Sequence, residues 1–126
     1  MNENLSIMTE TVSRDNLFVT GSGFPVVTDY VTIKSGNNLK RGTVLGIITT
    51  GSKAVAVDST KTDGSEVAYA ILASNTDATA ADTLAPVYLT GEYNGNKLIF
   101  GGTDTITNHK TALRKLSIFI KSAVPA

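Results

Sequence analysis

The sequence of 126 residues contains no cysteine and no tryptophan, and its only histidine is His109. A chain without cysteine forms no disulfide-stapled scaffold, no thiol redox centre and no zinc-thiolate site. Histidine is the usual proton-transfer group near neutral pH, so a single histidine leaves little material for acid–base catalysis. The 11 carboxylates are scattered singly and do not have the spacing of a calcium loop. We therefore expect no catalytic residues, no cofactor, no metal site and no small-molecule substrate.

Charged residues are also scarce. They make up 17% of the chain, and 11 basic side chains balance 11 acidic ones to a formal net charge of zero. Binding to nucleic acid needs a surplus of cations on one face to neutralise phosphates, so we expect no nucleic-acid partner. The chain has no run of 18 apolar residues, and residues 1–15 are too polar for a signal peptide. We expect a soluble protein that is not exported by this route and does not contact a membrane.

Threonine, valine and isoleucine are abundant, with 18, 11 and 9 residues. These β-branched side chains suit a pleated sheet better than a helix. Eleven glycines separate the β-branched stretches. A chain of this length is one domain's worth and buries roughly two thirds of the surface that it exposes when unfolded. The composition therefore predicts a single, mainly β domain.

Alternation of apolar and polar residues indicates where the strands lie. Residues 43–49 are apolar on both faces and predict a core strand, whereas the small alanines in residues 66–73 indicate a crowded interior. Asn94-Gly95 is the dipeptide most typical of a two-residue hairpin turn, so we expect residues 87–90 and 97–100 to pair across it. Residues 74–82 lack an apolar stripe and are predicted to be a loop. Further strands are predicted at 29–34, 53–57 and 117–121.

One short helix is predicted near the C-terminus, over residues 109–116. Thr105 or Thr107 can cap its N-terminus, and its basic residues gather toward the C-terminal end. Ala112, Leu113 and Leu116 share one face at helical spacing, which we expect to pack on the core.

Two groups of residues partly match functional motifs, one a hydrolase triad and the other a phosphate-binding loop. Ser117, His109 and Asp104 contain the groups of a hydrolase triad, but no serine lies in a nucleophile-elbow pattern. We expect His109 to be a surface or helix-end residue. Residues 46–53 have the length of a phosphate-binding loop, yet they end in Gly-Ser-Lys where that motif requires Gly-Lys followed by Ser or Thr. We predict a β-turn at residues 50–52 instead.

Residues 1–16 show no sustained period and are predicted to be a flexible N-terminal arm, followed by a single domain over residues 17–126. Glycines and a proline in residues 20–25 predict a hinge, and we expect the folded body to begin near Val26. Fifteen extended residues reach up to about 50 Å, while a body of this size has a radius of gyration of about 14 Å. Such an arm can contact a neighbour well outside the footprint of its own domain.

The sequence resembles the head-decoration protein family of tailed bacteriophages in the order and spacing of several blocks. These blocks are residues 23–28, 39–46, 63–73 and 87–93. The resemblance implies a small compact β-barrel-like or β-tulip domain. It also implies a homotrimer that binds the outside of the expanded head at threefold and quasi-threefold sites and stabilises it against DNA pressure. The expected location is therefore the outer surface of the virion capsid, after synthesis in the host bacterial cytoplasm.

In that family an N-terminal arm orders against the major capsid protein, and here the role falls to residues 1–16. We interpret Leu5, Ile7, Met8 and Val12 as the capsid-binding residues of the arm because of their apolar character. The alternative is a carbohydrate-recognising β-domain of a phage tail or cell surface. Such a domain needs aromatic platforms, for which four tyrosines and four phenylalanines are available.

Overall fold

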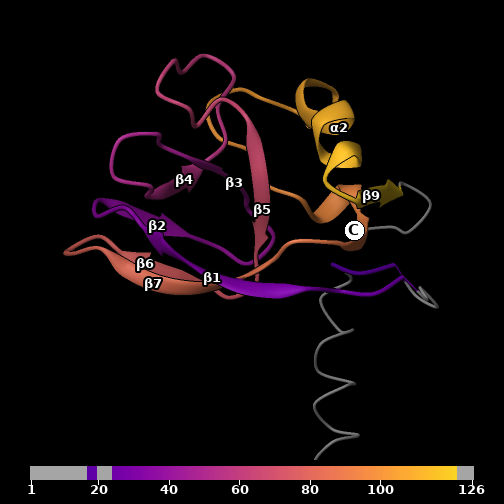
Figure 1. Cartoon of the computed structure of the whole chain (residues 1–126), viewed down its shortest axis with the longest axis horizontal. Coiled ribbons are helices and arrows are strands. Elements are labelled where there is room, and N and C mark those ends of the chain that lie inside the picture. Colours follow the sequence, from indigo (N-terminus) through magenta and orange to yellow (C-terminus); the bar gives the residue numbers. More distant parts are fainter. Residues whose placement is uncertain (1–16, 20–23, 122–126) are drawn as a thin grey trace, which may run out of the picture.

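The computed structural model describes residues 17–19 and 24–121 as a mainly β domain with one α-helix near the C-terminal end (Figure 1). This arrangement confirms the predicted fold class. The elements are β1 (Thr28–Ile33), β2 (Asn37–Leu39), β3 (Val44–Ile47), β4 (Ala54–Ala56), β5 (Ala68–Leu72), β6 (Thr76–Ala78), β7 (Thr83–Tyr88), β8 (Gly91–Asn94), the 3-10 helix η1 (Gly95–Lys97), α2 (Ile106–Lys115) and β9 (Ile118–Lys121).

Five strands close into a barrel in the order β1-β4-β3-β5-β7. β1 pairs antiparallel with β7 along its whole length, and it meets β4 in a short parallel contact at Ile33 and Ala54 that completes the circle. A closed barrel leaves no free strand edge around its circumference. One core is built from mostly small and medium apolar side chains of the barrel strands together with Ala78 of β6, and its buried members are Ile33, Leu45, Ala54, Ala70, Leu72, Ala78, Ala85 and Val87.

The predicted core strand and the crowded alanine strand are both confirmed. Residues Val44, Leu45 and Gly46 of β3 are buried, and β5 buries both Ala68 and Ala70. Crowding is greatest at Gly46, where an added Cβ would lie 2.3 Å from the Ser65 carbonyl oxygen. A glycine is required there because the backbone of the neighbouring loop occupies the space of a side chain.

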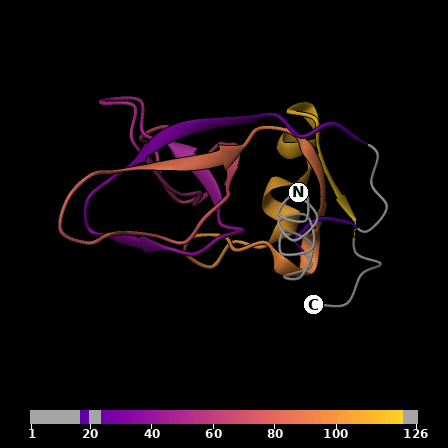
Figure 2. The same ribbon diagram turned by 90° about the horizontal axis from the view of Figure 1, so that it is seen from below.

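A second core lies between the barrel and the C-terminal elements. β8 and β9 pair in parallel, from Gly91 opposite Ile118 to Asn94 opposite Lys121, and α2 packs against β9 and β5. The two views show α2 and β9 gathered at one end of the molecule, with β1, β2 and β7 extending toward the other (Figures 1 and 2). The buried members of this core are Leu17, Val44, Val57, Ala68, Ile71, Tyr93, Leu98, Leu113 and Ile118.

The hairpin predicted at Asn94-Gly95 is wrong. Asn94 ends β8 and caps η1, where its side-chain oxygen accepts a hydrogen bond from the Asn96 backbone N–H at 3.1 Å. Asparagine favours such local side-chain bonds at helix N-termini as well as in hairpin turns, so the dipeptide does not distinguish the two. Lys97 belongs to η1 and Ile99 forms an isolated bridge with Thr43, whereas the predicted partner residues Val87 and Tyr88 end β7, which pairs with β1 and β5.

The loop predicted over residues 74–82 is also wrong in part, because Thr76–Ala78 forms β6 and pairs antiparallel with β2. Thr76 and Ala78 are buried while Asp77 is exposed, which is the alternation of a half-buried strand. Three residues are too few for this alternation to stand out in the sequence.

The predicted helix is confirmed, with its N-cap at Thr105, whose backbone N–H donates to the Asn108 side chain at 2.7 Å. Leu113 is buried as expected, but Leu116 is 36% exposed. The helix ends at Lys115, and Ser117 adopts a positive φ of 66° that turns the chain into β9. The helical face therefore does not continue to Leu116.

Candidate functional site

The first described residues lie alongside β8 and extend the small sheet of β8 and β9. The Asn94 backbone N–H donates to the Leu17 carbonyl at 2.7 Å, and the Val19 N–H donates to the Glu92 carbonyl at 3.1 Å. Residues 17–19 thus run antiparallel to β8 on the side opposite β9. The segment that precedes Leu17 joins the domain at this edge.

Leu17 belongs to the second core and is only 2% exposed. The folded body therefore includes Leu17, and the expectation that it begins near Val26 is wrong. Three residues cannot show a periodic pattern, and their place is fixed by pairing with β8, which is distant in sequence. The proposed arm, with Leu5, Ile7, Met8 and Val12, lies outside the described residues.

An aromatic cluster with one cation anchors this junction. The Phe18 ring lies 4.9 Å from the rings of both Tyr88 and Tyr93. The Arg41 guanidinium carbon is 5.8 Å from the Phe18 centroid and 5.4 Å from that of Tyr88. Arg41 also donates to the Tyr88 hydroxyl at 2.6 Å and to the Ala73 carbonyl at 2.8 Å. Cation–π contact and hydrogen bonds together hold Phe18 in place, and so fix where residues 17–19 enter the domain.

Tyr93 is the member of the cluster that has no exposed surface. Burial raises the pKa of its phenol well above the usual value, and the neighbouring Tyr88 acts in the same direction, so the group stays neutral. Its hydroxyl donates to the Thr90 carbonyl at 2.7 Å. Tyr93 is therefore a satisfied structural residue of the junction.

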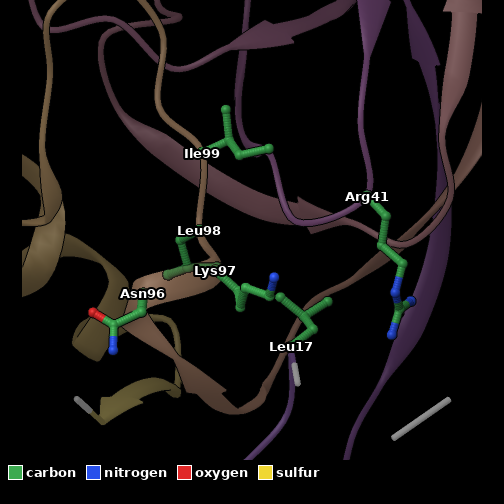
Figure 3. Close-up of a pocket in the computed structure, with 6 residues that line it drawn as sticks. All are labelled: Leu17, Arg41, Asn96, Lys97, Leu98 and Ile99. Carbon is green, nitrogen blue, oxygen red and sulfur yellow. The ribbon is translucent and has the colours of Figure 1, made fainter. Parts of the chain in front are cut away.

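A groove of about 300 Å³ opens beside the junction (Figure 3). The close-up shows Lys97 extending toward Leu17, with the Arg41 guanidinium to one side of them. Two cations and an amide thus lie next to apolar side chains where the N-terminal segment joins the body. The lining residues are Leu17, Arg41, Asn96, Lys97, Leu98 and Ile99.

An apolar patch lies on the outer surface of the barrel. Its most exposed members are Leu84 at 66%, Tyr30 at 62% and Tyr69 at 39%. They border a shallow depression of about 440 Å³ whose lining contains no charged side chain. Large exposed apolar groups gathered at one place are typical of a protein contact surface. The remaining lining residues are Val31, Thr32, Ile47 and Ser52.

His109 lies in the first turn of α2, which fits the expected helix-end position, but it is buried, so the expectation of a surface position is wrong. Its Nε2 lies 2.6 Å from Asp104 Oδ2, and the ring stacks on Phe100 at 5.6 Å between centroids. The Ser59 hydroxyl donates to the other carboxylate oxygen of Asp104 at 2.6 Å. The carboxylate is thus the central member of the three, whereas in a hydrolase triad the histidine must lie between the serine and the acid. Ser117, the serine named in the sequence, makes no described hydrogen bond to His109.

The structure also bears on the segment that resembles a phosphate-binding loop, on metal binding and on membrane spans. Residues 50–52 form the predicted turn, in which Gly51 and Ser52 have positive φ angles of 91° and 56°. Within residues 17–19 and 24–121, no three histidine or acidic side chains are grouped closely enough to bind a metal ion. In those same residues, no helix has the length and apolar character needed to cross a membrane.

These features define a small, mainly β barrel domain whose candidate sites are contact surfaces. The family model of the bacteriophage lambda head decoration protein D matches residues 7–120, so the chain belongs to that family. Family membership gives it a structural role in decorating the phage capsid. No curated protein matches the sequence.

Proposed function

We propose that the chain is a capsid-stabilising decoration protein that binds as a homotrimer to the outer surface of the expanded phage head. It occupies threefold and quasi-threefold sites, contacts the major capsid protein, and resists the pressure of the packaged DNA. The observation that carries this proposal is the family match over residues 7–120, which covers most of the described domain and part of the proposed arm.

In this proposal, residues 1–16 are a capsid-binding arm, with Leu5, Ile7, Met8 and Val12 as its apolar contacts. The support is the firm junction at which the arm joins the body, where Leu17 is buried and Phe18 packs between Tyr88 and Tyr93. The arm can hold the domain on the shell only if the residues that connect the two stay packed against the domain. An extended arm that adds to a sheet edge gains main-chain hydrogen bonds, and its apolar side chains set the register.

Self-association through the apolar patch supplies the trimer. The patch carries two tyrosines and a leucine, and its lining has no charge to desolvate. Around a threefold axis, three copies of the same uncharged surface can meet without placing like charges together. Joining three arms in one particle makes the second and third contacts intramolecular, which multiplies weak single contacts into firm attachment.

The proposed role requires no catalysis. Among the described groups that resemble catalytic machinery, the side chains of Asp104 and His109 are buried and lie against each other, and the exposed Ser59 donates to the same carboxylate. We therefore propose that the chain is not an enzyme and that it binds neither nucleic acid nor a small-molecule substrate.

The experiment is to mix the purified chain with expanded, undecorated heads of its own phage and to follow co-sedimentation. Light scattering coupled to size exclusion gives the oligomer mass beforehand. We expect a trimer that binds heads at saturation and raises their resistance to osmotic shock. A chain with Leu5, Ile7, Met8 and Val12 all changed to Ser should remain a trimer but bind heads weakly. A monomer at high concentration that binds no heads would refute the proposal.

A further inference from the structure

The outer edge of β9 has no described strand partner. β8 pairs with one side of β9, and residues 17–19 pair with the far side of β8, so β9 is the outermost described strand of this three-stranded sheet. An unpaired strand edge presents backbone groups that can pair with another chain. The barrel strands offer no comparable edge because their sheet is closed.

The bonding pattern shows which groups face outward. The Gly91 N–H donates to the Ser117 carbonyl, so alternate residues from Ser117 onward bond to β8. The backbone groups of the intervening residues, Ile118 and Ile120, therefore point away from β8. Ile118 is fully buried whereas Ile120 is partly exposed, so the N–H and the carbonyl of Ile120 form the accessible part of the outer edge, where a short added strand can pair.

A basic groove of about 210 Å³ lies along the same strand. Lys110 and Arg114, one helical turn apart on α2, line it together with the four residues of β9, of which Lys121 carries the third cation. All three cations are exposed, and no acidic residue lines the groove. The walls are otherwise apolar, since they include Ile118, Phe119 and Ile120.

We propose that an extended segment of the capsid shell protein, carrying carboxylate side chains among apolar ones, adds as a strand to the outer edge of β9 and sets its carboxylates against Lys110, Arg114 and Lys121. This inference rests on the proposed function and adds a second contact to the one made by the arm. Main-chain pairing supplies the attachment, and the three cations select an acidic partner.

The position of β9 favours the shell protein as the occupant. The N-terminal segment joins one edge of the small sheet and β9 forms the other, with only β8 between them. A shell that binds residues 1–16 therefore lies close to the β9 edge as well. A nucleic acid fits less well, because the groove is apolar between its cations and the chain as a whole has no net positive charge.

The test compares two full-length double variants with the unmodified chain. Lys110→Gln with Arg114→Gln removes two groove cations. Lys34→Gln with Lys115→Gln removes the same charge from exposed lysines outside the groove, one of them on the same helix. Affinity for expanded heads is measured at low and high salt, the trimer mass is checked by light scattering, and hydrogen–deuterium exchange follows residues 118–121 with and without heads.

We expect the groove variant to bind heads at least about tenfold more weakly at low salt, to lose most of the salt dependence, and to remain a trimer. The control variant should bind like the unmodified chain, and the amides of residues 118–121 should exchange more slowly on heads. Equal binding by both variants, with the unmodified chain still decorating heads, would overturn this inference and leave the proposed function intact.

Three further results are informative. A changed oligomer mass in the groove variant would overturn the inference, because the groove would then join copies of this chain. Binding of double-stranded DNA by the unmodified chain, lost in the groove variant, would overturn it in favour of a nucleic-acid contact. Failure of the unmodified chain to bind heads at all would instead refute the proposed function, and the inference with it.

Discussion

Asp104 Oδ2 and His109 Nε2 lie 2.6 Å apart, and neither side chain is more than 4% exposed. The same carboxylate accepts hydrogen bonds from the backbone N–H and the hydroxyl of Ser59, both at 2.6 Å. One acidic side chain therefore ties the loop after β4 to the first turns of α2. The contact is structural, and it makes stability depend on the ionisation of Asp104.

The first prediction concerns acid stability. Hydrogen bonds from Ser59 and then from His109 hold the pKa of Asp104 below its usual value. A group with a lowered folded-state pKa contributes stability above its unfolded pKa of about 3.9, and the contribution is lost as the pH falls through the folded value. Asp104→Asn should therefore be less stable than the unmodified chain at neutral pH, with the difference shrinking in acid. Thermal unfolding between neutral and strongly acidic pH measures this.

A companion variant tests the cause of that shift. Ser59→Ala removes the hydroxyl bond, which is the largest contribution to the lowered pKa of Asp104. Its acid unfolding should begin at a higher pH than that of the unmodified chain. The contradicting result is a stability difference between Asp104→Asn and the unmodified chain that stays constant down to the lowest pH. It would show that ionisation of the Asp104 carboxylate does not contribute to stability.

The second prediction concerns the crowded glycine of β3. In Gly46→Ala, the new Cβ would meet the Ser65 carbonyl oxygen at 2.3 Å and two further backbone atoms of Ser65 at 2.8 Å. Backbone must shift, so we expect a loss of about 1–3 kcal/mol in the free energy of unfolding, measured in denaturant. Gly51→Asn is the contrast, because nothing lies within 4 Å of a Cβ there and asparagine tolerates positive φ. Equal losses at the two sites would contradict the packing argument.

The third prediction concerns the apolar patch. Leu84→Lys places a charge at its most exposed position, where three copies would bring like charges together. We expect the trimer to dissociate at concentrations at which the unmodified chain stays associated, with the thermal stability of the monomer unchanged. Leu116→Lys is the matched control, because Leu116 is also exposed but lies outside the patch. Sedimentation velocity distinguishes the two, and an intact Leu84→Lys trimer would place the self-contact elsewhere.

The fourth prediction distinguishes the role of the arm in head binding from the role of Leu17 in folding. Deletion of residues 1–14 should leave a folded trimer that binds heads more weakly. Leu17→Ala should instead destabilise the fold. Truncating a side chain that is only 2% exposed lowers the free energy of unfolding by about 2–5 kcal/mol. Denaturant unfolding and head co-sedimentation, run on both variants, separate the two effects. Undiminished head binding by the deletion variant would remove the arm from the proposed function.

Local patterns in the sequence predicted some of the elements. Strand β3, strand β5 and the Thr105 cap of α2 were predicted from the composition of the residues within or next to each element, namely a continuous apolar run, a run of small alanines and a capping threonine. β6 and residues 17–19 were not predicted, because three residues carry too little periodicity. Their places are fixed by partners far along the chain, β2 for the one and β8 for the other.

The parallel pair of β8 and β9 shows the same limit more strongly. Residues 91–94 meet residues 118–121 across η1 and α2, and a parallel ladder has no tight turn to signal it. Asn94-Gly95 instead suggested an antiparallel hairpin. The burial of His109 was missed for a related reason, because its partners Asp104 and Phe100 both lie before the helix and carry no helical periodicity.

Asn94 bonds to Leu17 on one side and stands opposite Lys121 on the other, so this sheet unites the beginning and the end of the described chain. During translation, residues 17–19 and β8 emerge from the ribosome before the last strand exists. The sheet is completed only after residue 121 has been synthesised. A prematurely terminated polypeptide therefore lacks the β9 edge, and assembly would discriminate finished molecules from unfinished ones.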